Sequence, residues 1–226
     1  MRMTCFKKLK WSLAGLLVLS IGLCSWGTFS EARKDDFGKK TGSSNKPGTV
    51  DGFRTAKFGM KERDVARAIF KDFRVPRSKV NRIVHPSEKT TSLGIEVKDL
   101  LPNTGKAHVF YILGYKTKKL IQVNVLWGGP AGKAEDPQSI VNAANQLRSH
   151  FIQKGFPEEG MLLNTQLKDG TIVVFRGIDP EGRVALLILN NPTNENAPPN
   201  KNIHLRLSYI ENPDTPDVFK IKRGDF

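Results

Sequence analysis

Residues 108–127, HVFYILGYKTKKLIQVNVLW, hold the pattern that decides the fold. Residues 108–113 form a continuous apolar run, which is typical of a central strand. After a polar turn at residues 115–119, apolar side chains occupy every second position from Ile121 to Trp127. Two strand patterns separated by one short turn predict an antiparallel hairpin.

A helix and another strand are predicted before this hairpin. Residues 61–73 carry apolar side chains at helical spacing and acidic residues in the first turn, and Pro76 ends the pattern. We expect Phe70 to widen the apolar side of this helix, and a second short helix over residues 78–84. From residue 91 to residue 97 apolar and polar side chains alternate, which predicts a strand.

The same order of elements is predicted after the hairpin. Asp136 and Pro137 are suited to begin a helix that Gly155 ends. Further strands are predicted over residues 161–167, 171–176, 184–189 and 203–209. Runs of antiparallel hairpins after a helix indicate the α+β class, and the order predicts two tandem helix-plus-antiparallel-sheet units.

The N-terminal residues have the pattern of an export signal. The first ten contain four basic residues and no acid, and residues 11–23 are uncharged and apolar. This pattern predicts a secretory signal over residues 1–32 that is cleaved, leaving the protein in the periplasm. Two alternatives stay open: an uncleaved signal that anchors the chain to the inner membrane, and lipidation of Cys24, although Leu23 rather than a small residue precedes it.

Composition defines three further parts of the chain. Residues 33–51 are rich in Gly, Ser and Lys and predict a flexible basic tether. We expect residues 52–130 to form the first helix-plus-sheet unit and residues 131–226 to form the second, with an extended C-terminal tail. The two cysteines fall at positions 5 and 24, inside the predicted signal, which excludes a disulfide framework and a thiolate metal site from the rest of the chain.

Charge is distributed unevenly between the two units. Residues 51–130 hold 16 basic and 7 acidic residues, whereas residues 131–226 hold 11 and 12. Basic residues four, four and three apart place one stripe on the first helix, and others extend it past Pro76. The stripe consists of Arg63, Arg67, Lys71, Arg74, Arg77, Lys79 and Arg82. It predicts an anionic partner, either a protein or an envelope component, and peripheral contact with a membrane is one form of that interaction. The alternative is a charged face that only water solvates.

Motifs typical of metal binding, nucleophilic catalysis and phosphate binding are absent from the sequence. The histidines at positions 85, 108, 150 and 204 do not pair at metal-ligand spacing, and we expect His108 to lie in the core. The sequence contains neither a nucleophile elbow nor a phosphate-binding loop. We therefore expect no catalytic residues, no metal and no cofactor, and export makes nucleic acid an unsuitable partner. The alternative is a periplasmic enzyme whose site folding assembles from distant residues.

Residues 58–65, FGMKERDV, open the first helix and are followed by antiparallel strands. This arrangement resembles the small outer-membrane-assembly lipoproteins of the SmpA/OmlA type. It is also similar to the repeat of the β-lactamase inhibitor protein, which stacks two helix-plus-sheet copies. The resemblance implies a module that binds proteins or envelope components and is not an enzyme. It differs from the family pattern at Lys61, where a hydroxyl residue usually caps the helix.

Overall fold

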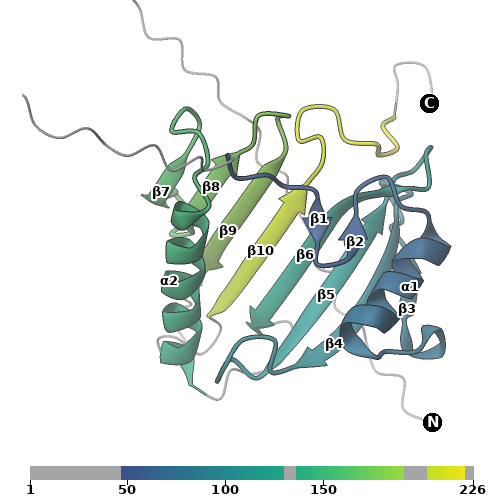
Figure 1. The fold of residues 1–226 in the computed structure, drawn as a ribbon, viewed down its shortest axis with the longest axis horizontal. Coiled ribbons are helices and arrows are strands. Elements are labelled where there is room, and N and C mark those ends of the chain that lie inside the picture. Colours follow the sequence, from purple (N-terminus) through teal and green to yellow (C-terminus); the bar gives the residue numbers. More distant parts are fainter. Residues whose placement is uncertain (1–46, 130–135, 191–202, 222–226) are drawn as a thin grey trace, which may run out of the picture. The chain divides into compact units, whose positions relative to one another are not determined.

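The computed structural model describes residues 47–129, 136–190 and 203–221. Eight strands form one sheet in the order β3-β4-β5-β6-β10-β9-β8-β7, and every neighbouring pair is antiparallel (Figure 1). The strands are β3 (Asn81–Val84), β4 (Thr91–Lys98), β5 (Lys106–Leu113), β6 (Leu120–Gly128), β7 (Leu162–Gln166), β8 (Ile172–Ile178), β9 (Val184–Asn190) and β10 (His204–Ile210). The predicted hairpin is β5–β6, near the middle of the sheet.

Two helices and a small hairpin lie on one face of this sheet (Figure 1). The helices are α1 (Glu62–Phe73) and α2 (Pro137–Gln153), and the hairpin consists of β1 (Gly52–Phe53) and β2 (Ala56–Lys57). The predicted cap of α2 is confirmed, since the Asp136 carboxylate accepts a hydrogen bond of 3.0 Å from the Gln138 backbone N–H. Helices that cover an antiparallel sheet confirm the predicted α+β class.

Alternation along the strands decides which side chains form the core. On β6, Val123, Val125 and Trp127 are buried against the helices, together with Leu205 and Leu207 on the neighbouring strand β10. Their neighbours along each strand face the opposite side of the sheet, because successive side chains of a strand alternate in direction. The alternation of apolar and polar side chains over residues 121–127 therefore reflects a strand with one buried face.

Aromatic rings link the two halves of the chain beneath the β1–β2 hairpin. Phe53 of this hairpin stacks on Phe73 of α1, with ring centroids 6.3 Å apart, and on Tyr209 of β10, at 5.8 Å. Phe151 of α2 contacts the same Tyr209 ring at 6.2 Å and stacks on Phe175 of β8 at 5.1 Å. The predicted units therefore share one core as well as one sheet.

The prediction of a short helix over residues 78–84 is wrong. A single 3-10 turn covers Arg77–Lys79, and β3 follows it. Two β-branched residues, Ile83 and Val84, end this segment, and its backbone pairs along β4 from Asn81 to Val84. Strand pairing at the sheet edge thus outweighed the helical spacing of the basic residues. The first half contributes four strands to the eight-stranded sheet rather than the three predicted.

The folded region begins earlier than residue 52. Val50 is 2% exposed, and its N–H donates a hydrogen bond of 2.9 Å to the Asp179 carboxylate. The N–H of Gly48 donates to the carbonyl of Gly155 at 3.1 Å. Residues 48–50, near the end of the predicted tether, therefore pack against the second half of the chain. Residues 33–46 and the predicted signal lie outside the described residues.

His108 does not lie in the core. It belongs to the face of β5 opposite the helices, where its Nε2 lies 3.6 Å from a carboxylate oxygen of Glu96. The Lys106 ammonium lies 2.8 Å from the same carboxylate, and its hydrogen bond holds the pKa of Glu96 below its usual value. The continuous apolar run of residues 108–113 therefore fills both faces of the sheet, and only one of them is the core.

Candidate functional site

The predicted basic stripe lies on adjacent elements at the β3 edge of the sheet. All seven of its side chains are exposed. Arg63, Arg67 and Lys71 project from α1, whose other side buries Val65 and Ile69. The remaining members follow in chain order: Arg74 ends α1, Arg77 and Lys79 belong to the 3-10 turn, and Arg82 lies on β3.

Acidic neighbours engage three of the seven cations. Arg67 forms an ion pair with Asp64. The hydrogen bond that the Arg67 guanidinium donates to the Asp64 carboxylate holds the pKa of Asp64 below its usual value. Glu62 lies 3.3 Å from Arg82 and 3.9 Å from Arg77. Within the described ranges, the other four members of the stripe have no carboxylate within ion-pair distance. The stripe therefore keeps an excess of positive charge at its surface.

An open hollow of about 770 Å³ adjoins the N-terminal end of α1. Its lining consists of Gly59, Lys61, Arg63, Asp64, Arg67 and Lys119. Four of these six residues are basic and one is acidic, so the hollow is strongly positive. Together the seven residues of the stripe and Lys61 and Lys119 make up what we call the basic surface.

Lys61 and Lys119 were not among the predicted site residues. Two backbone hydrogen bonds bring them together: Gly59 N–H donates to Leu120 O at 2.9 Å, and Leu120 N–H donates to Met60 O at 2.8 Å. Lys61 and Lys119 then pair across an isolated antiparallel bridge. Like charges placed opposite each other are unfavourable, so the fold brings these two cations together at a cost. Lys119 is one of the lysines of the turn at residues 115–119, and Lys61 directly precedes α1. No local sequence pattern indicated that either residue joins the stripe.

Phe70 lies within the basic side of α1 and not on its apolar side, contrary to the prediction. With a rotation of about 100° per residue, Phe70 falls within about 60° of Arg63 and Arg67 on the helix. The residue is 51% exposed, and the Arg74 guanidinium lies 6.0 Å from its ring centroid. The core does not need this ring, because Ile69 on the inner side is fully buried.

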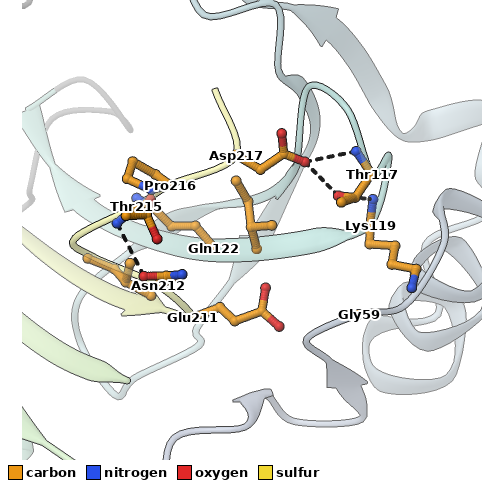
Figure 2. A pocket seen from close by; sticks show the side chains of 11 residues that line it. Gly59, Thr117, Lys119, Gln122, Glu211, Asn212, Thr215, Pro216 and Asp217 are labelled. Carbon is orange, nitrogen blue, oxygen red and sulfur yellow. Dashed lines mark hydrogen bonds between the residues drawn. The ribbon is translucent and has the colours of Figure 1, made fainter. Parts of the chain in front are cut away.

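A second cavity, of about 250 Å³, shares Gly59 and Lys119 with the hollow (Figure 2). Its other walls come from the start of β6, the end of β10 and the segment that follows β10. Glu211 and Lys119 lie on different walls (Figure 2). Burial raises the pKa of Glu211, and the charges of Arg183 and Lys119 oppose this rise. The cavity thus adds two carboxylates, Glu211 and Asp217, beside an otherwise basic region.

Asp217 holds the C-terminal segment against the β5–β6 turn. One carboxylate oxygen accepts from Lys116 N–H at 3.0 Å, and the other accepts from the N–H and the hydroxyl of Thr117 at 2.8 and 2.7 Å (Figure 2 draws the latter pair). Partial burial acts to raise the pKa of Asp217, but these hydrogen bonds outweigh it and the pKa is lowered. This carboxylate is therefore an anchor and is not available to a ligand.

This anchor is expected to weaken in acid. Because folding lowers the pKa of Asp217, its stabilising contribution is present above the unfolded-state pKa of about 3.9 and is lost as the pH falls through the folded value. The amide resonances of Lys116 and Thr117 should titrate with a midpoint below pH 4 in NMR spectra of the wild type. In Asp217→Asn this titration should disappear. A wild-type midpoint above pH 4 would contradict the assignment.

Two further observations concern the residues that the structure describes. Nowhere among them do three or more His, Cys, Asp or Glu side chains gather closely enough to hold a metal ion. Neither α1 nor α2 has the length and apolar character of a membrane-crossing helix, and no other helix in the described ranges does.

Comparison with known protein families, with curated proteins and with solved structures gives no significant match to this chain.

Proposed function

We propose that this chain is an exported, non-enzymatic binding or accessory module of the cell envelope. Its basic surface would bind an acidic protein face or an anionic envelope component. The observation that carries the proposal is the basic hollow, where the fold gathers Lys61, Arg63, Arg67 and Lys119 around a single acidic residue, Asp64. Charges of one sign in a concave surface attract counter-charged ligands and raise their rate of association.

The energetics of α1 favour the same proposal. Like charges four residues apart on a helix destabilise it by about 0.2–0.5 kcal/mol per pair. Arg63 and Arg67 have this spacing, as do Arg67 and Lys71, and the buried side of α1 requires none of them. The ion pair of Arg67 with Asp64 offsets part of this repulsion, and an anionic partner that neutralises the surface would remove the rest.

Export and the tandem organisation belong to the same proposal. We infer cleavage of the signal over residues 1–32 and release into the periplasm, with an uncleaved inner-membrane anchor as the alternative. We also infer two tandem helix-plus-sheet units of the SmpA/OmlA or inhibitor-repeat type. The order of elements supports this inference, since α1 precedes β3–β6, α2 precedes β7–β10, and the two sets join through their last strands, β6 and β10.

Charge reversal tests the binding function. Arg63→Glu with Lys71→Glu should weaken binding to polyglutamate about tenfold or more at low salt, because each cation near an anionic surface contributes about 1 kcal/mol. Both positions lack an ion pair in the described part of the chain, so the change breaks none. Binding can be measured by titration calorimetry, with circular dichroism to check the fold. Wild-type binding should also weaken at high salt, because screening acts over about 8 Å at physiological ionic strength.

The matched control is Lys154→Glu with Lys168→Glu. It changes the net charge by the same amount, and both lysines are exposed in the second half of the chain. We expect it to bind polyglutamate nearly as the wild type does. Equal binding by the Arg63/Lys71 variant and the wild type would show that the basic surface is only a solvated face.

A further inference from the structure

Exposed apolar side chains gather on the same segment as the cations. Among the described residues, Phe70 is 51% exposed, Ile83 51% and Val84 48%. Phe70 lies among the members of the stripe on α1. Ile83 and Val84 follow Arg82 on β3, and Val84 shares a face of that strand with Arg82. The segment therefore presents large apolar groups and positive charges together, although the core uses neither.

We propose that α1 docks on the surface of an anionic phospholipid bilayer, with Phe70 entering the boundary between headgroups and acyl chains. This inference rests on the proposed function and names the partner of the basic surface. Peripheral helices that bind membranes combine basic residues with an aromatic or aliphatic group that reaches this boundary. Arg63, Arg67 and Lys71 would bind phosphate groups, and their long aliphatic stems could lie along the apolar boundary.

The surroundings of Phe70 favour a bilayer over an acidic protein. The Arg74 guanidinium lies 6.0 Å from the ring centroid, and the helix places Arg63 and Arg67 on the same side of α1 as this ring. A protein partner would need an apolar pocket encircled by acids in matching positions. An anionic bilayer supplies both features at every point, since phosphates overlie acyl chains across its whole surface.

A photo-crosslinker placed at position 70 tests the contact directly. We would replace Phe70, and in a separate chain Leu163, with p-benzoylphenylalanine in the full-length protein. Leu163 is the matched control because it is an apolar residue of similar exposure, 41%, on β7 in the second half. The probes are vesicles of phosphatidylcholine with and without phosphatidylglycerol. All chains retain residues 11–23, so membrane contact by that apolar run is common to every sample.

We expect lipid adducts at position 70 with the phosphatidylglycerol vesicles, far fewer without that lipid, and few at position 163. Arg63→Glu with Lys71→Glu should suppress the adducts.

Phe70→Ser should weaken binding to these vesicles about tenfold, because one phenyl ring no longer moves from water into the bilayer, and it should affect polyglutamate binding much less. Absence of lipid adducts at position 70, or equal yields at positions 70 and 163, would overturn the inference.

The outcomes separate this inference from the proposed function. Salt-sensitive polyglutamate binding that depends on Arg63 and Lys71, without lipid adducts at position 70, would refute membrane docking and leave the binding function intact. Adducts to envelope proteins in place of lipid would refute it too. Polyglutamate binding that is indifferent to the charge reversal would refute the proposed function itself.

Discussion

Leu187→Ala is expected to lower the free energy of unfolding by about 2–5 kcal/mol, the usual cost of truncating a fully buried leucine. Leu187 on β9 is 0% exposed. In the strand register it lies between Leu207 of β10 and Phe175 of β8, and all three belong to the core. Removal of its side chain would leave a cavity under α2, because the surrounding strands cannot close fully on it.

Leu186→Ala supplies the matched control, because the strand, residue type and substitution are the same. Leu186 points to the face opposite the helices, where Ser208 and Arg176 are its register neighbours, and it is only partly buried. Its truncation should cost about 1–2 kcal/mol. Urea unfolding with equal m-values gives both numbers. A loss at Leu186 equal to that at Leu187 would mean that the two faces of β9 are wrongly assigned.

Asp179→Ala is expected to cost about 2–4 kcal/mol, since it leaves three N–H groups without their acceptor. The carboxylate is 3% exposed and accepts from Glu181 N–H at 2.9 Å, Arg183 N–H at 2.8 Å and Val50 N–H at 2.9 Å. The first two bonds organise the β8–β9 turn, and the third fastens the N-terminal segment to it. Arg183 adds a hydrogen bond of 3.2 Å to the Val50 carbonyl.

Asp179→Asn separates these two roles. The remaining carbonyl oxygen can still accept from Glu181 and Arg183, but an amide NH₂ facing Val50 N–H cannot accept its hydrogen bond. We expect a smaller loss of stability than in Asp179→Ala, with faster hydrogen exchange concentrated at Val50. Unchanged protection of Val50 in both variants would contradict the anchoring role.

Local sequence patterns were sufficient to predict those helices and turns whose formation depends on neighbouring residues. The helical spacing over residues 61–73 and the Asp136–Pro137 start located both helices, because caps and amphipathic periodicity act within a few turns. The strands predicted over residues 161–167 and 171–176 form the β7–β8 hairpin, because the residues between them suit a tight turn. Residues 78–84 misled the prediction, since the edge of β4 decides their backbone and no local signal reports its presence.

The sequence by itself determined the α+β class, both helices, the alternation of the strands and the exposed basic stripe on α1. Only the tertiary structure decided that β6 pairs with β10, that Val50 is buried against Asp179, that Phe70 stays exposed and that Lys119 joins Lys61. Each of these depends on contacts between residues far apart in the chain or on which side of a helix finds a partner. Periodicity reports that a side is apolar, whereas packing decides how wide the buried part of that side is.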